Sequence, residues 1–418
     1  MKDKVYLCID LKSFYASVEC VERGLDPFEI CLVVADPSRG GGAITLAATP
    51  AIKSLGVKSR GRIYEIPDSI EYMIAPPRMH LYMEYSAKIY GIFLKYIASE
   101  DIHVYSIDES FLDVTPYLEL YRCTPKELAK RILADIYEET GITATVGIGT
   151  NLFLTKVALD ITAKHTPDHM GYLNEQLFRQ TLWHHQPLTD FWMIGRGTVN
   201  RLSALGIKDL YDLAHYPEEI IYQTFGVNGE FLLDHAWGIE PTTIQDIKAY
   251  VPKANSLSNS QILFEDYAFQ DAYLILKEMV DTNVLELTEK HLVTNHIGLF
   301  IGYSKDVRKP SRGSRKITNC TNSYRILLEE FTLLFNKIVD RNYPIRHIGI
   351  GFGNVKDELY QQYDLFANVE DIEKEQKLQS ALVEIRNKYG KNSALKGMNL
   401  LDKATARYRN TTIGGHKA

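Results

Sequence analysis

Hydrophobic runs that end in polar turns predict a sheet domain in the first part of the chain. Short continuous or alternating runs, typical of strands, occur at residues 4–11, 30–35, 103–114 and 143–150. Stretches with helical spacing or helix-ending glycines cover residues 13–24, 51–56, 78–99, 125–140 and 152–164. Because strands and helices are interleaved along this stretch, we expect an α+β domain that ends near residue 168.

The rest of the chain predicts a helical region, a second α+β unit and a tail. Residues 168–240 are helical in pattern and interrupted by glycines, and residues 245–265 are typical of a linker that passes into a strand. The second unit is predicted from helices at 269–290 and 323–340 and strands near 292–303, 315–320 and 345–354. Residues 357–418 predict a polar, mostly helical tail.

Composition places the chain among ordinary globular proteins. Its 418 residues allow two to four domains at about 150 residues each. The sequence contains no run of the roughly 18 uncharged apolar residues that a membrane span needs, so we expect no membrane partner. The five cysteines form no C-x-x-C pair, which is typical of reduced thiols. These features together predict a soluble, cytoplasmic protein.

Charge is distributed unevenly along the chain. The net charge of −6 argues weakly against a nucleic-acid partner. Residues 1–249 carry 23 Lys and Arg against 33 Asp and Glu, whereas six of the twelve residues 305–316 are Lys or Arg. The basic run is a candidate phosphate-binding surface, and an ordinary solvated face is the alternative interpretation.

Three acidic residues stand where strands end or turn. Asp10 lies at the end of the first strand, and Asp108 and Glu109 lie in the turn of a later one. If these strands are neighbours, three carboxylates come together, and such oxygen donors suit Mg²⁺. Two ions at such a centre would activate an attacking oxygen and neutralise a leaving phosphate. Each acidic turn, taken alone, is more typical of an ordinary protein surface than of a metal site.

The segments IDLKSFYASVE (9–19) and YSIDESFLDV (105–114) resemble the two metal-binding motifs of Y-family, translesion DNA polymerases, in the same order and with similar spacing. The resemblance continues through VGIGTNLFLTKVALDITAK (146–164) and over nearly the whole chain, and it is strongest to the UmuC-like branch of Gram-positive bacteria, their plasmids or phages. It implies an α+β, right-hand polymerase. The implied domains are a palm (1–168) with inserted fingers (about 25–75), a helix-hairpin-helix thumb (169–241), a tether and separate α+β little finger (242–356), and a tail with a clamp-binding peptide (357–418).

The resemblance also implies the catalytic centre. Asp10, Asp108 and Glu109 would hold two Mg²⁺ ions, with the main-chain carbonyl of Leu11 as a further ligand. Glu109 would serve the ion that lowers the pKa of the primer 3′-OH. Tyr15 would be the steric gate, whose ring clashes with a ribose 2′-hydroxyl. A core aromatic residue is the alternative interpretation of Tyr15.

Further residues are implied to bind the nucleotide. Phe14 would pack beneath the sugar, and Lys53 and Lys164 would contact the triphosphate. Pro50 replaces a phosphate-binding Tyr of other branches, so the Thr49 hydroxyl is a candidate substitute. The segment from Asp160 to Lys164 is one residue longer than in some members of the family.

Three more segments are candidate contacts for DNA or a protein partner. Residues 193–207 have the hydrophobic-Gly-x-Gly form of a helix-hairpin-helix, and a tight turn between helices is the alternative. The candidates for phosphate contact there are Gly195, Arg196 and Gly197. In the basic run, Ser314, Lys316 and Thr318 would face the DNA groove, and Arg308, Lys309, Arg312 and Arg315 would contact phosphates. Residues 362–366 resemble the bacterial sliding-clamp peptide, with Gln362, Leu365 and Phe366 as its anchors.

The sequence therefore predicts a template-directed, error-prone DNA polymerase of translesion synthesis in an SOS-type damage response. Its predicted partners are primer-template DNA, deoxynucleoside triphosphates and the sliding clamp, and a recombinase filament or accessory subunit is a further candidate. A non-catalytic DNA- and clamp-binding accessory protein is the first alternative, but it predicts a broken acidic triad, and all three carboxylates are present. A palm-type nucleotide cyclase is the second, and it needs neither thumb nor little finger.

Overall fold

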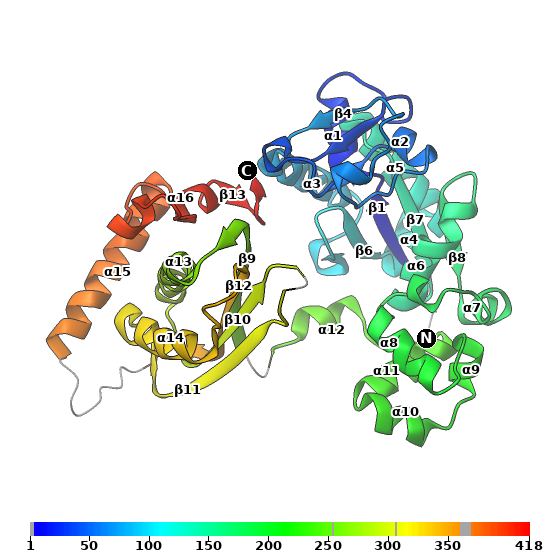
Figure 1. Ribbon diagram of the computed structural model, residues 1–418. Helices are drawn as coiled ribbons and strands as arrows, with labels where there is room; N and C mark the ends of the chain where they lie inside the picture. Colours follow the sequence, from blue (N-terminus) through cyan, green and yellow to red (C-terminus); the bar gives the residue numbers. More distant parts are fainter. Residues whose placement is uncertain (1–3, 253–254, 306, 360–368) are drawn as a thin grey trace. The chain divides into compact units, whose positions relative to one another are not determined.

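The computed structural model describes residues 4–252, 255–305, 307–359 and 369–418 (Figure 1). The chain divides into two compact units, Met1–Tyr250 and Val251–Ala418. The first unit contains the predicted palm, fingers and thumb, and the second contains the predicted little finger together with the described part of the tail.

A five-stranded sheet with the order β5-β6-β1-β7-β8 forms the centre of the first unit. Its strands are β1 (Tyr6–Leu11), β5 (Ile102–Val104), β6 (Glu109–Asp113), β7 (Ala144–Gly149) and β8 (Met170–Leu173). The central strand β1 is antiparallel to both β6 and β7, and its residues Leu7 and Cys8 are fully buried. Strand β8 pairs with β7 in parallel, so the sheet extends beyond the boundary expected at residue 168.

The helices of the palm are α1 (Phe14–Val21), α3 (Met79–Phe93), α4 (Thr115–Tyr121), α5 (Pro125–Thr140) and α6 (Leu152–Val157). Helix α5 has the bounds that the sequence predicts, because a Thr124–Glu127 capping box starts it and Gly141, at φ +69°, ends it. Helix α1 starts only at Phe14 because the backbone of Ser13 adopts the left-handed conformation, with φ at +50°. Helix α3 ends at Phe93, ahead of the predicted 99, in a turn that precedes the 3₁₀ turn Ser99–Asp101.

The helix predicted over 152–164 changes its winding partway. After α6 the chain forms a π-helical turn, Ala158–Thr162, and then a 3₁₀ turn, Ala163–His165. A π turn holds one more residue than an α turn, which fits the extra residue noted in this segment. Gly147 lets the segment lie directly against β7, because a Cβ there would be 2.1 Å from the Thr155 carbonyl oxygen.

The fingers are a small sheet with the order β3-β2-β4 and one helix. Their elements are β2 (Leu32–Val34), β3 (Ala47–Ala48), α2 (Pro50–Ser54) and β4 (Met73–Ala75), with short 3₁₀ turns at Pro37–Arg39 and Ile63–Glu65. Val33, Ala48 and Ile52 form their buried core.

The thumb is helical, as predicted. It comprises α7 (Glu175–Leu182), a 3₁₀ turn (Leu188–Asp190), α8 (Arg196–Ala204), α9 (Leu210–Ala214), α10 (Glu218–Phe225) and α11 (Asn228–Trp237). The next helix, α12 (Ile244–Ala249), lies where a linker was expected. Its Ile244 is fully buried against Tyr6 and Cys8 of the palm, so this helix belongs to the first unit.

The second unit is an antiparallel sheet covered by helices. The order is β11-β10-β12-β9, with β9 (Asn255–Tyr267), β10 (Leu292–Tyr303), β11 (Ser311–Thr321) and β12 (Ile345–Asp357). Helices α13 (Phe269–Glu289) and α14 (Tyr324–Ile338) enclose the core with Ile297, Leu299 and Ile301 of β10. Because strand side chains alternate, His296, Gly298 and Phe300 lie on the opposite face of the sheet.

The tail folds onto this second unit. Its elements are α15 (Val369–Tyr389), a 3₁₀ turn (Gly397–Leu400), α16 (Ala406–Arg409) and the hairpin β13 (Thr412–Ile413) and β14 (His416–Lys417). Glu278 of α13, only 3% exposed, accepts hydrogen bonds from the backbone N–H groups of Thr405 and Ala406 at 2.8 and 3.2 Å. Asp281 pairs with Lys396 at 2.6 Å. The described tail is therefore an integral part of the unit.

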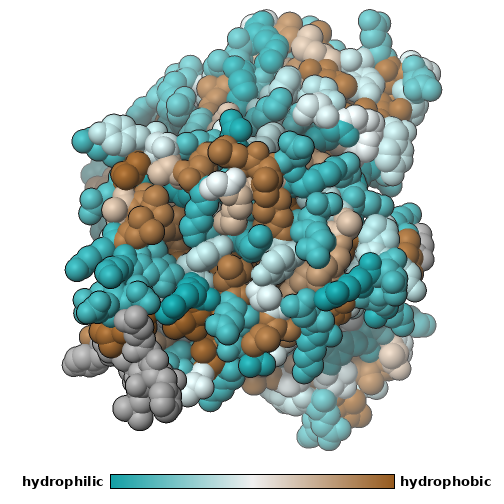
Figure 2. Space-filling view, turned by 60° about the vertical axis from the view of Figure 1, so that its left-hand side comes forward, coloured by the Kyte–Doolittle hydropathy of each residue, from teal (hydrophilic) through white to brown (hydrophobic). Residues whose placement is uncertain are grey.

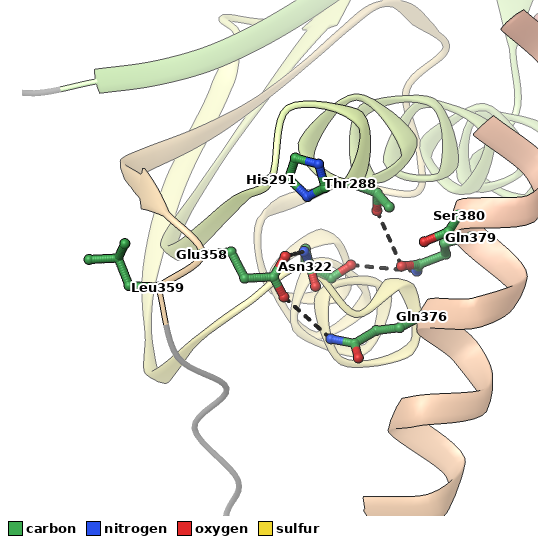
Figure 3. Close-up of a pocket in the computed structure, with 8 residues that line it drawn as sticks. All are labelled: Thr288, His291, Asn322, Glu358, Leu359, Gln376, Gln379 and Ser380. Carbon is green, nitrogen blue, oxygen red and sulfur yellow. Dashed lines mark hydrogen bonds between the residues drawn. The ribbon is translucent and has the colours of Figure 1, made fainter. Parts of the chain in front are cut away.

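A polar pocket marks the place where α15 meets the ends of α13 and β12 (Figure 3). Gln379 accepts a hydrogen bond from the Thr288 hydroxyl at 3.3 Å, and Gln376 donates to Glu358 at 3.4 Å. Glu358 also accepts from the Asn322 amide at 3.1 Å. These bonds attach α15 to the unit through polar contacts.

The face shown in Figure 2 is mostly hydrophilic, and hydrophobic residues occur there in small groups. Among the residues that the structure describes, no helix is long and apolar enough to cross a membrane.

Candidate active site

The antiparallel pairing of β1 and β6 brings the three acidic residues together. Asp10 and Glu109 are direct partners across the two strands, and the Leu11 N–H donates to the Asp108 carbonyl at 2.9 Å. Asp108 is oriented by the Ser106 hydroxyl, which donates to its Oδ1 at 2.6 Å. Residues far apart in sequence thus form one acidic centre at the end of β1.

Negative charge in this centre is only partly neutralised. Burial raises the pKa of Asp10 to about 7, and repulsion by Asp108 and Glu109 adds to the effect. Burial and the neighbouring carboxylates therefore make ionisation of Asp10 costly, and a cation bound among the carboxylates would relieve that cost.

One cation of the protein does reach the centre. Lys156 of α6 places its Nζ 2.9 Å from Glu109 Oε2 and 3.1 Å from Asp160, and the Cys8 thiol donates to Glu109 Oε1 at 3.1 Å. Burial opposes the charge of Lys156, but Asp160 and Glu109 raise its pKa overall, so it stays protonated. Neither Lys156 nor Asp160 is among the site residues predicted from the sequence. Their signal is a charged pair four residues apart inside an otherwise hydrophobic helix.

In the described ranges no three His, Cys, Asp or Glu side chains form a ready-made metal site. The donor chemistry nevertheless fits a hard divalent cation. Asp10 and Asp108 supply carboxylate oxygens beside the main chain of Leu11, and burial, followed by the repulsion of Asp108 and Glu109, raises the pKa of Asp10. Glu109 could join them by sharing or releasing Lys156.

Tyr15 lies beside the acidic centre at the start of α1. Burial raises the pKa of its phenol, and the charge of Asp108 raises it further. Its ring stacks on Tyr82 of α3 with centroids 4.3 Å apart and planes at 15°. Phe14 is 3% exposed, and its ring centroid is 5.7 Å from that of Tyr15.

Of the three predicted triphosphate contacts, Lys53 lies near the acidic centre, and Lys164 lies near Lys53. Lys53 donates to the Ser13 hydroxyl at 2.8 Å. Burial lowers the pKa of Lys53, the charge of Asp10 opposes this, and the charge of the exposed Lys164 lowers it further. Thr49 is different. It is fully buried, and its hydroxyl donates to the Ile30 carbonyl at 2.8 Å and accepts from the Leu32 N–H at 3.0 Å. The structure therefore does not support Thr49 as a phosphate donor.

The thumb hairpin exposes its glycines at the start of a helix. Gly195 is the N-cap of α8, no side chain caps that helix, and Gly195, Arg196 and Gly197 are all exposed. Leu202 is buried in the thumb core, where Val199 and Leu205 also pack. The first backbone N–H groups of α8 are thus presented at the surface, where an anion can approach them.

The basic run divides between the two faces of β11. Arg312, Ser314 and Lys316 are exposed on the face opposite the helices, where they pair with Phe300, Gly298 and His296 of β10. The Arg312 guanidinium lies over the Phe300 ring, 5.1 Å from its centroid. Thr318 and Lys309 are exposed as well.

Two arginines of the run have partners within the second unit. Arg315 points to the helix side and forms an ion pair with Glu330 of α14, because neighbouring strand residues face opposite sides. Arg308 pairs with Asp340 and lies over the Tyr343 ring. Both arginines thus form intramolecular ion pairs, which argues against the phosphate contacts expected for them. The expected clamp anchors Gln362, Leu365 and Phe366 lie outside the described residues.

Comparisons with known proteins agree with this architecture. Residues 9–160 match the family described as impB/mucB/samB, and residues 254–365 match the C-terminal domain of that family. The chain is 34% identical to the UV-damage repair protein UvrX of Bacillus subtilis (strain 168), over 99% of this chain and 98% of the relative. It is 29% identical to DNA polymerase IV 2 of the same organism, over 100% and 99%.

A solved structure shares the fold. A Y-family DNA polymerase chimera, Dbh-Dpo4(243-245)-Dbh, superposes with a TM-score of 0.65 over 84% of this chain and 99% of its own, at 22% identity. Together with the sequence matches and the acidic centre at β1 and β6, this identifies the chain as a member of the impB/mucB/samB family, the Y-family DNA polymerases that copy DNA templates in translesion synthesis.

Proposed function

We propose that this polymerase carries out nucleotidyl transfer at the centre formed by Asp10, Asp108 and Glu109, with the Leu11 carbonyl as a further ligand, and that two Mg²⁺ ions are held there. The observation that carries the proposal is the direct pairing of Asp10 with Glu109 beside Asp108. Bound Mg²⁺ would make the primer 3′-OH a better nucleophile and stabilise the leaving pyrophosphate. The side chains position groups and supply charge, which is most of what phosphoryl transfer requires.

The neighbouring residues bind the incoming nucleotide. Lys53 is a cation near Asp10, Lys164 is a second cation near Lys53, and two such charges suit a triphosphate. The Tyr15 ring lies against the nucleotide sugar and excludes a 2′-hydroxyl, with Phe14 packed beside it. Replacing Tyr15 with Ala is therefore expected to admit ribonucleotides.

The exposed face of the second unit binds the duplex. The register aligns Ser314, Gly298, Gly351 and Ser258 in one row across all four strands, so the sheet is nearly free of side chains there. Lys316 lies on one side of this row and Arg312 on the other. A smooth strip between two cations lets a sugar-phosphate backbone approach the sheet closely. The exposed N-terminus of α8 in the thumb is a second phosphate contact.

The partner proposed for Gln362, Leu365 and Phe366 is the sliding clamp. Apolar anchors dominate the affinity of short peptides, so replacing both Leu365 and Phe366 with Ala is expected to abolish stimulation by added clamp while leaving synthesis on a bare primer-template unchanged. Loss of both activities together would mean that these residues support the fold instead. A DNA substrate agrees with the cytoplasmic location proposed for this protein.

Primer extension tests the catalytic centre. Asp108→Asn is expected to abolish Mg²⁺-dependent nucleotide addition and to leave primer-template binding within a few-fold, because the carboxylate binds metal rather than duplex. Glu138→Gln, an exposed acidic residue of α5, is the matched control and should extend primers as the wild type does. Extension by Asp108→Asn at the wild-type rate would overturn the assignment.

A further inference from the structure

A buried polar network lies directly behind Tyr15. Helices α1 and α3 pack against each other (Figure 1). Tyr15 and Glu19 are four residues apart on α1, so their side chains lie on the same face of that helix. A single residue of α3, Tyr82, contacts both. Its ring stacks on Tyr15, and its hydroxyl donates to Glu19 Oε1 at 2.7 Å.

Glu19 anchors this arrangement. Its side chain is fully buried, and Arg78 binds it with two hydrogen bonds, from Nε to Oε1 at 3.0 Å and from Nη2 to Oε2 at 2.7 Å. Arg23 forms a further ion pair with the same carboxylate. Each carboxylate oxygen of Glu19 therefore has two partners. A planar bidentate contact such as that with Arg78 fixes the orientation of the carboxylate as well as compensating its charge.

Protonation states reinforce the contacts. Burial opposes ionisation of Glu19, but its bonds to Arg78, Tyr82 and Arg23 outweigh that cost and hold its pKa below the usual range. Burial and the Glu19 bond raise the pKa of Tyr82, so its phenol remains a donor. The Tyr82 ring is fully buried, and its hydroxyl is tied to an anchored carboxylate. It presents a fixed flat surface to Tyr15.

We propose that Tyr82, held by Glu19 and Arg78, is a positioning residue that sets the sugar selectivity of this polymerase by holding the Tyr15 ring against the nucleotide. Tyr15 is itself partly exposed, so its ring needs support from behind to exclude a 2′-hydroxyl. This inference rests on the proposed role of Tyr15. It adds that rejection of ribonucleotides depends on a residue that does not touch the nucleotide.

The test compares dCTP with rCTP incorporation. Tyr82→Leu removes the stacked ring and is expected to reduce discrimination about two- to tenfold, the range that corresponds to one aromatic pair. The kcat/KM for dCTP should stay within a few-fold, because the catalytic centre is unchanged. Tyr82→Phe keeps the stacked ring but loses the hydroxyl bond to Glu19, so its discrimination should lie between that of Tyr82→Leu and the wild-type ratio.

Tyr85→Leu is the matched control. Tyr85 lies one turn further along α3 and donates to Glu22 at 2.8 Å, in the same pairing as Tyr82 with Glu19, but the structure records no ring contact between it and Tyr15. It should discriminate as the wild type does. A purely structural role of α3 would instead lower activity towards both nucleotides equally in the Tyr82 and Tyr85 variants.

Two further variants keep the outcomes distinct. If Tyr15→Ala retains the wild-type ratio, the role proposed for Tyr15 is wrong and this inference fails with it. If Tyr15→Ala accepts rCTP but Tyr82→Leu discriminates normally, only this inference is overturned.

Should Tyr82→Leu not fold, Arg78→Met tests the same network, because the Arg78 side chain is 42% exposed and its replacement disturbs the core less. It should relax discrimination measurably, and an unchanged ratio would refute the network.

Discussion

The acidic centre of the first unit and the basic strand β11 of the second unit differ in how sequence position relates to the spatial position of their charged residues. In the centre, Asp10 and Glu109 are distant in sequence, yet strand pairing makes them neighbours. Along β11, Arg312 and Arg315 are close in sequence, yet they lie on opposite faces, one exposed beside Phe300 and one paired with Glu330. Proximity in sequence is thus a poor guide to shared function, whereas position in the sheet decides which charges act together.

The two regions also differ in how strongly their charges interact. Glu109 and Lys156 are 8% and 9% exposed, so solvent screens them little. Arg312 and Lys316 are exposed, so each is free to exchange water for phosphate at small cost. The centre proposed to hold cations needs the first environment, and the surface proposed to bind DNA of any sequence needs the second.

The largest expected effect comes from removing the buried cation. Lys156→Met leaves Glu109 and Asp160 without their partner and is expected to destabilise the first unit by about 3–5 kcal/mol. Urea unfolding followed by tryptophan fluorescence measures this, because Trp183, Trp192 and Trp237 all lie in that unit. Lys95→Met, which breaks the exposed pair with Glu139, is the control and should have a far smaller effect. Equal midpoints for the two variants would mean that burial does not distinguish the pairs.

A smaller effect is expected from the buried carboxylate of the second unit. In Glu278→Gln, one carboxylate oxygen is replaced by an amide N–H₂ group, which cannot accept hydrogen bonds from the backbone N–H groups of Thr405 and Ala406. We expect the free energy of unfolding to fall by about 1–3 kcal/mol. Limited proteolysis should then cut residues 391–418 faster, while tryptophan fluorescence remains unchanged. Unaltered proteolysis would show that the tail is held by other contacts.

The smallest effect concerns the two faces of β11. Replacing Arg312 and Lys316 with Ser is expected to reduce the slope of log K against log salt for primer-template binding by about 0.9 for each lost phosphate contact. Replacing Arg308 and Arg315 with Ser should leave the slope unchanged, because both are paired with carboxylates. The reverse result would mean that these ion pairs open on DNA and that the strand register does not select the DNA-binding side.

Local pattern was sufficient for helix α5 and for the residues that form the acidic centre. Helix α5 is predictable because its capping box and terminal glycine are adjacent in sequence to the helix they limit. The acidic centre is predictable because Asp10 and the Asp108–Glu109 pair stand at strand ends, and strand ends meet when strands pair. Long motifs of this kind also identify the family, since they specify residue type and spacing together.

Only the tertiary structure decided which polar side chains are committed to partners inside the fold. Thr49 is polar, but burial between Ile30 and Leu32 commits its hydroxyl to the backbone. Lys156 belongs to the centre because the π-containing segment lies against the sheet. The tail is part of the second unit because Glu278 needs its N–H groups. In each case a buried polar group must find a partner, and that partner is distant in sequence, so no local pattern reveals it.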